Sequence, residues 1–248
     1  MKKFYLSVFL IFSLFIAPCV FASGFEMPEQ FAEAGTGYVA AKNVEREFNP
    51  FNLSYGVKSK SPDRTWRYDA LSSVQFSDKI FDFTLEGKYF IPYTSWEMDN
   101  SKIDLGLKAI YHFQRYYDLY SENDFYIESV FRFVTRNRLV FLANLGNGFK
   151  AASVDSLERG ALWDITLSGS VVLNYYFDSG AEIYGGVVSH ELYRYPLAYT
   201  PTDYLGFAWN FKSGFRISSD IGIRLHDWFV VSPYIDRYEW NLKARFTF

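Results

Sequence analysis

The sequence predicts an all-β fold, a closed antiparallel transmembrane up-and-down β-barrel, and three observations support it. Apolar and polar residues alternate with a period of two in segment after segment, as in strands whose two faces differ. These segments run over about nine to fifteen residues, longer than strands of globular proteins and matched to a tilted strand that crosses a bilayer. Aromatic residues make up 21% of the chain, more than a soluble core needs.

Residues 1–22 precede this pattern and predict a cleaved secretory signal peptide. Two lysines come first, a long apolar run follows, and Ala22 offers a small residue for cleavage. The apolar run is long enough that an uncleaved membrane anchor stays open as an alternative. Cys19, the one cysteine of the chain, would also fit a lipoprotein signal, but Pro18 is a poor residue before a lipidated cysteine.

The alternating segments give a count of ten strands, with twelve or eight as alternatives. Residues 139–149 alternate less clearly and are a candidate for a further strand. The barrel is expected over residues 51–248, whereas residues 23–50 fit no strand and are expected to form a periplasmic tail or a plug. The expected strands are residues 51–59, 66–76, 81–91, 103–113, 125–133, 163–177, 181–190, 205–217, 221–235 and 240–248.

Short polar turns are expected at SDK (77–79), SEND (121–124), DSG (178–180) and SSD (218–220). They alternate with longer connections, which predicts short turns at one end of the barrel and long loops at the other, with both termini at the short-turn end.

Two of these turns also predict a strand register. DSG pairs Phe177 with Ala181 and leaves Gly180 at a position that favours the left-handed conformation. At SDK, the register that sets Asp69 opposite Lys88 is favoured, because opposite charges stabilise a cross-strand pair.

One face of the strands carries large aromatic side chains near the strand ends. A soluble barrel shows the same alternation with its apolar face inward. However, a narrow interior could not easily hold so many rings, so these residues are expected to face lipid. The expected lipid-facing girdle consists of Trp66, Tyr68, Phe76, Trp163, Phe177, Trp240, Phe246 and Phe248.

The opposite face would then line the lumen, and it carries charges of both signs. Buried charges need partners, so a structural network is the default interpretation, and a small polar conduit is compatible with it. The expected lumen residues are Arg67, Asp69, Glu86, Lys88, Asp104, Lys108, Glu128, Arg132, Asp164, Glu182, His190, Lys212, Arg216, Lys243 and Arg245, and Asp82, His112 and Arg224 share their face.

The last nine residues, WNLKARFTF, alternate up to the final Phe248. This ending resembles the C-terminal signature of Gram-negative-type outer-membrane β-barrel proteins, a resemblance at the level of the class that also covers the signal peptide and the strand pattern. It implies export to the bacterial outer membrane, contact with outer-membrane lipid, and recognition of the last strand by the barrel assembly machinery.

The sequence constrains the function less tightly than it constrains the fold. A narrow channel for ions or small solutes, or a structural surface protein, fits best. The alternatives are an enzyme acting on lipid or peptide, and surface adhesion or ligand binding through the Tyr-rich connections at 92–101 and 192–203. The candidate catalytic pair is Ser168 with His190, expected opposite each other, but no third orienting residue is evident.

Several other classes are not indicated. The three histidines are far apart in the sequence, so neither a metal site nor a cofactor is expected. The formal net charge is −3 and no basic block occurs, so nucleic-acid binding is not expected either. The oligomeric state stays open.

Overall fold

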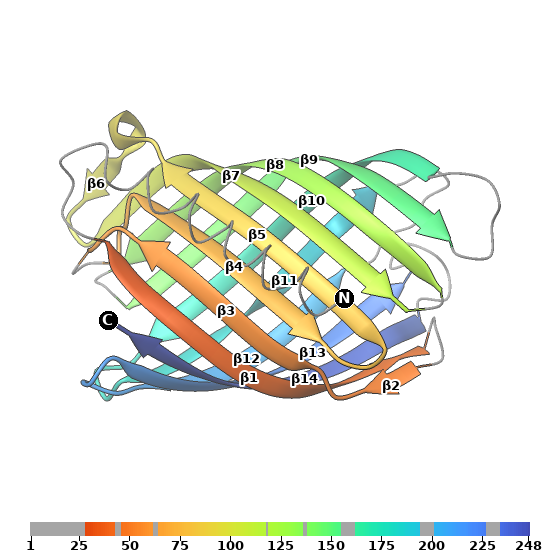
Figure 1. Ribbon diagram of the computed structural model, residues 1–248. Coiled ribbons are helices and arrows are strands. Elements are labelled where there is room, and N and C mark those ends of the chain that lie inside the picture. The colour runs from red at the N-terminus through yellow and green to blue at the C-terminus, as the bar shows by residue number, and fades with distance from the viewer. Residues whose placement is uncertain are drawn as a thin grey trace.

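The computed structural model describes residues 28–42, 46–61, 64–117, 119–135, 138–154, 162–193, 201–226 and 234–248. Successive strands pair antiparallel around a ring, and the last strand pairs with the first, which closes an up-and-down barrel (Figure 1). Within these residues, twelve strands form the ring. They are β1 (Glu29–Ala41), β3 (Phe51–Lys58), β4 (Tyr68–Phe76), β5 (Ile80–Phe90), β7 (Ser101–Tyr116), β8 (Tyr120–Thr135), β9 (Leu139–Val154), β10 (Leu162–Tyr176), β11 (Ala181–Tyr193), β12 (Thr202–Asn210), β13 (Phe215–His226) and β14 (Tyr234–Thr247).

Three short elements lie at the barrel ends. β2 (Arg46–Phe48) pairs with the end of β1, and β6 (Trp96–Met98) pairs with the start of β7. A 3₁₀ turn, η2 (Pro92–Thr94), lies between β5 and β6. No helix among the described residues is both long and apolar enough to cross a bilayer.

The fold class is confirmed, and the strand count is the predicted alternative of twelve rather than ten. One additional strand is β9, the uncertain segment at 139–149. The other is β1, so the expected tail or plug at 23–50 is wrong for Glu29–Ala41. The outward positions of β1 include Ala32, Ala34 and Thr36, which are too small to give a clear apolar stripe. The expected signal peptide at 1–22 lies outside the described residues.

The predicted separation of short turns from long loops is wrong, because β9 reverses the chain direction once more between SDK and DSG. The SDK turn therefore lies at one end and the DSG turn at the other. Phe248 is at the DSG end, hydrogen-bonded to Gln30, so both barrel termini lie there. We call this the terminal end and the other the distal end.

Two expected turns are parts of strands instead. SEND at 121–124 belongs to β8, and SSD at 218–220 belongs to β13. The turn before β13 falls at residues 211–214, where Gly214 has a φ of 81°.

The two registers derived from charge and turn chemistry are confirmed. Asp69 pairs with Lys88 across β4 and β5. Phe177 donates its backbone N–H to Ala181, and Gly180 adopts a φ of 92°. Where a turn was correctly identified, the register of the two strands that it connects could therefore be derived from the residues close to it.

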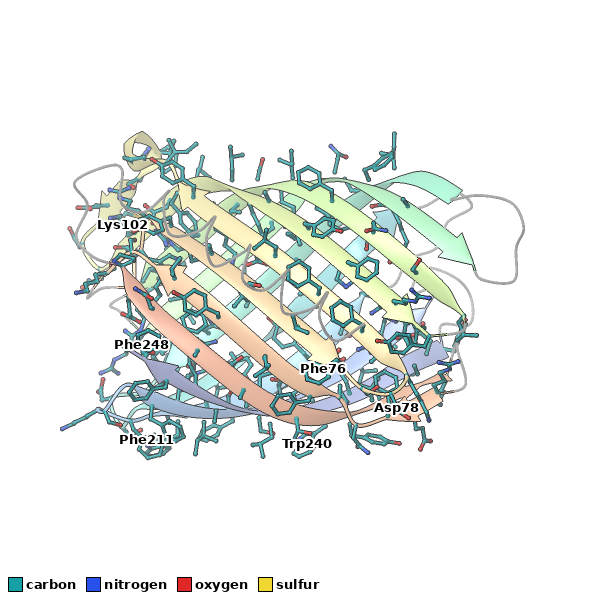
Figure 2. All side chains as sticks on the ribbon, in the orientation of Figure 1. Phe76, Asp78, Lys102, Phe211, Trp240 and Phe248 are labelled. Carbon is teal, nitrogen blue, oxygen red and sulfur yellow. The ribbon has the colours of Figure 1, made fainter. Side chains whose placement is uncertain are left out.

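The barrel is apolar outside and charged inside. Leu107, Ile165 and Leu205 are each more than half exposed on the outer face, whereas Arg132 and Asp104 are fully buried. Figure 2 shows Phe76, Trp240 and Phe248 on the outer surface, from which they project away from the barrel. This inversion of the usual protein core is expected when the outer face contacts hydrocarbon.

Candidate functional site in the barrel lumen

Adjacent strands β7 and β8 show how the lumen is layered. Their inward residues pair directly across the two strands, so each pair forms one step between the terminal and the distal end. From the terminal end, the steps are Asp104 with Arg132, Gly106 with Val130, Lys108 with Glu128, Ile110 with Tyr126, and His112 with Asp124.

The first step anchors the terminal mouth. Arg132 Nη2 donates to Asp104 Oδ2 at 2.6 Å, and its Nη1 donates to the carbonyl oxygen of Trp66 at 2.7 Å. The guanidinium also lies 3.7 Å from the ring centroid of Phe90. Ser95 donates to the other Asp104 oxygen at 2.5 Å, so one ion pair ties two connections to the wall.

Trp66 corrects one girdle prediction. Its indole N–H donates to Asp69 at 2.5 Å and its ring lies 5.2 Å from the Arg132 guanidinium, so it lies at the lumen mouth rather than on the lipid face. The reason is that β4 begins only at Tyr68, so the strand alternation does not extend to Trp66.

The next steps form a charged row on one wall. Lys88 contacts both Asp69 and Glu86, and Lys108 Nζ lies 3.1 Å from Glu86 and 3.4 Å from Glu128. Each lysine therefore bridges two carboxylates, and this pairing offsets the free-energy cost of burying the charges.

The wall formed by β11 to β14 and β1 carries a second set of ion pairs. Arg216 Nη2 lies 3.3 Å from Glu182, and Arg245 Nε lies 3.0 Å from Glu33. Tyr184, whose ring lies 5.4 Å from Arg216, donates its hydroxyl to Asp220 at 3.1 Å.

A cavity of about 720 Å³ lies between these walls. It reaches from Ser61, Arg64 and Gly180 at the terminal end to Lys108 and Val188 deeper in the lumen. Its size is within the range of pockets that hold small molecules.

An apolar step follows the cavity. Ile110 and Tyr126 are 3% and 0% exposed, and a Cβ on Gly148 would lie 1.9 Å from the Tyr126 ring. The Tyr126 ring therefore packs directly on the backbone of Gly148.

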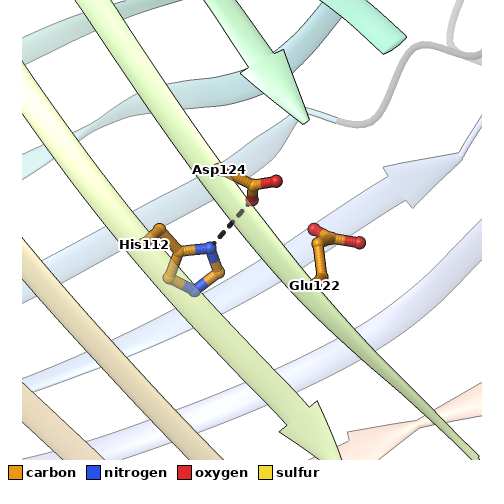
Figure 3. Close-up of side chains that lie close together, drawn as sticks. All are labelled: His112, Glu122 and Asp124. Carbon is orange, nitrogen blue, oxygen red and sulfur yellow. Dashed lines mark hydrogen bonds and ion pairs between the residues drawn. The ribbon is translucent and has the colours of Figure 1, made fainter. Parts of the chain in front are cut away.

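Beyond it lies a compact polar network, of which Figure 3 shows His112, Glu122 and Asp124. His112 Nδ1 lies 3.0 Å from Asp124, and its Nε2 lies 3.0 Å from Asp82. Lys150 Nζ lies 2.8 Å from Glu122. Because ionised carboxylates only accept hydrogen bonds, the imidazolium form of His112 satisfies both contacts.

The same network contains one group with metal-ligand geometry. One ligand atom from each of His112, Glu122 and Asp124 lies within 4.8 Å of the other two. The sequence did not predict this group of possible metal ligands, because Glu122 and Asp124 were expected in a turn. The histidine nitrogens already face Asp82 and Asp124, and Lys150 pairs with Glu122, so each of the three candidate ligands already has a polar partner in the network.

The structure places most of the expected lumen residues inside the barrel. Lys212 is an exception: it lies exposed on the turn between β12 and β13, because the expected strand 205–217 is interrupted there. Arg67 precedes β4 and contacts Ser95. The side chains of Asp164, His190 and Trp163 lie outside the described set. The residues on inward faces are Asp69, Glu86, Lys88, Asp104, Lys108, Glu128, Arg132, Glu182, Arg216, Lys243 and Arg245.

The expected pairing of Ser168 with His190 is not formed in the sheet. The ladder between β10 and β11 passes from Gly169 opposite Ser189 to Leu167 opposite Tyr193, so it shifts across this position. Ser168 is fully buried, and its hydroxyl has no hydrogen-bond partner within the part of the chain that the structure describes.

Of the expected girdle residues, Phe76, Phe177, Trp240, Phe246 and Phe248 are exposed, between 39% and 62%. Tyr68 pairs with the exposed Tyr89 on the same face. Sequence reasoning did not single out Arg64, Tyr184 or Tyr204 as cavity residues, although the period-two pattern could have placed the two tyrosines inward.

No protein-family model matches the chain, and no curated protein matches it significantly. Solved structures do. The NanC porin aligns with a TM-score of 0.54 at 10% identity, over 87% of this chain and 98% of its own. The KdgM porin in complex with a disordered oligogalacturonate aligns with a TM-score of 0.51 at 9% identity, over 88% and 99%. An outer-membrane channel from Pseudomonas putida F1 gives 0.50 at 11% identity, over 91% and 97%. At these identities the likeness shows the fold alone, and the chain has the closed β-barrel fold of these porins and channels.

Proposed function

We propose that this protein is a narrow channel for small polar solutes. The observation that carries the proposal is the cavity of about 720 Å³, lined by charged side chains, inside a barrel with the fold of small porins. A purely structural barrel of this size could fill the same space with side chains. The cavity instead leaves room for a hydrated solute next to Lys88 and Arg216.

The orientation follows from the termini. An exported chain reaches the outer membrane from the periplasm, and its last strand is read there by the assembly machinery. We therefore assign the terminal end to the periplasm, with residues 1–22 acting as the signal peptide and the exposed aromatic side chains contacting outer-membrane lipid. The layer of Ile110, Tyr126 and Gly148 then forms the constriction on the path toward the outside.

The test is single-channel conductance of purified protein in planar bilayers. Wild type is expected to give small conductance steps, and Tyr126→Ala larger ones, because the substitution removes a ring from the constriction. Phe125→Ala is the matched control, since the neighbouring Phe125 is 47% exposed on the outer face and its loss leaves the lumen unchanged. Folded wild-type protein without conductance would contradict the proposal.

A further inference from the structure

Two pairs of like charges lie side by side on the inward face. Lys88 is directly opposite Lys108, and Arg216 is directly opposite Arg245. Like charges in directly opposite positions destabilise a sheet unless something compensates them. All four residues line the cavity.

The carboxylates that compensate the two arginines are set back into the wall. In the pair of Arg245 and Glu33 the side chains are 28% and 8% exposed, and in the pair of Arg216 and Glu182 they are 15% and 7% exposed. On that wall, a solute in the cavity therefore meets the two arginines before their carboxylates. On the lysine side, Glu128 is more buried than Lys108, whereas Asp69 and Glu86 are about as exposed as Lys88 and line the cavity with it.

The two cation pairs come from different sides of the barrel. β7 and β13 are six strands apart in either direction around the ring, so Lys108 and Arg216 project from opposite walls. Arg64 adds a further cation at the mouth. It lies 4.1 Å from the Tyr176 ring and has no carboxylate within salt-bridge distance in the described residues.

Counted over the described lining, six basic side chains face three acidic ones. The bases are Lys58, Arg64, Lys88, Lys108, Arg216 and Arg245, and the acids are Asp69, Glu86 and Glu182.

We infer that the cavity binds a small solute with at least two oxyanion groups, carboxylate or phosphate, held between the two cation pairs. Arginine offers a planar fork of N–H donors that matches both groups. The Arg64 side chain, at the mouth, would meet such a solute as it enters. The inference rests on the proposed solute-accessible lumen and names the class of solute that would occupy it.

The experiment measures binding to folded protein in detergent micelles by calorimetry, with citrate and inorganic phosphate as anionic probes and glucose as the uncharged probe. Wild type is expected to bind at least one anion more tightly than glucose, and less tightly as NaCl is raised. Arg216→Gln is expected to weaken anion binding about tenfold, the loss of one charge-assisted contact. Lys212→Gln, which removes a charge from the exposed turn, is expected to bind like wild type.

Arg64→Gln is the second variant, since it leaves no described carboxylate unpaired and does not threaten folding. Heat-modifiable gel mobility checks that each variant is folded. Wild type that binds neither anion, or folded Arg216→Gln and Arg64→Gln proteins that bind as tightly as wild type, would overturn the inference. Because binding in micelles does not require conduction, this result is independent of the conductance test.

Discussion

The terminal and distal halves of the lumen are built from the same kinds of residues but differ in what they leave open. In the terminal half, lysine and arginine side chains pair with carboxylates around a cavity of about 720 Å³, whose described lining has more basic than acidic side chains. In the distal half, His112 lies between Asp82 and Asp124, and Lys150 pairs with Glu122, in a compact cluster. Ion pairs therefore occur both in a compact cluster and around the cavity that we propose as a solute site. The two halves differ in the space left beside the ion pairs and in the sign of the charge that faces this space.

The largest expected effect comes from breaking the ion pair at the terminal mouth. Arg132→Met leaves Asp104 as a fully buried carboxylate without its cation, and we expect a loss of about 3–5 kcal/mol in the free energy of unfolding. The measurement is urea unfolding from lipid vesicles.

Arg138→Met is the matched control, because Arg138 and Asp178 form an exposed pair with the same 2.6 Å distance. Exposed pairs contribute about 0–1 kcal/mol. Similar losses of unfolding free energy in the two variants would show that the buried ion pair at the mouth stabilises the barrel no more than an exposed pair does.

A smaller loss is expected in the distal half. His112→Ala removes the group that Asp82 and Asp124 share and leaves both carboxylates short of a donor, which should cost about 2–3 kcal/mol in the same unfolding assay. Anion binding in the terminal cavity should not change. Asn123→Ala, on the outer face of β8, serves as the control. Equal stability of the two variants would mean that the network is not a structural unit.

The smallest effect concerns the layer between the halves. Gly148→Ala places a methyl group against the Tyr126 ring, and the forced shift should cost about 1–2 kcal/mol. Gly87→Ala meets nothing within 4 Å and should be neutral or slightly stabilising, since alanine restricts the unfolded chain. If Gly148→Ala were also neutral in unfolding, the tight contact between Tyr126 and Gly148 would be disproved.

Much of the barrel followed from local pattern. The alternation in β7, with Leu105 and Leu107 outward and Asp104 and Lys108 inward, is enough to identify both faces of that strand. Local pattern failed where a strand lacks large apolar residues, as in β1, and where polar residues that resemble a turn continue a strand, as Glu122 and Asp124 do in β8. Polar inward positions and polar turns look alike in sequence, because both lack hydrophobic residues.

By itself, the sequence determined the fold class, the apolar exterior and the charged interior, because strand alternation needs only neighbours two residues apart. The tertiary structure decided everything that depends on closure: the twelve strands, the pairing of β1 with β14, and which charges meet across strands. It brought Lys108 and Arg216 from opposite walls to one cavity and enclosed His112 between two aspartates. Such contacts join residues far apart in the chain, and strand order and register fix them rather than local sequence.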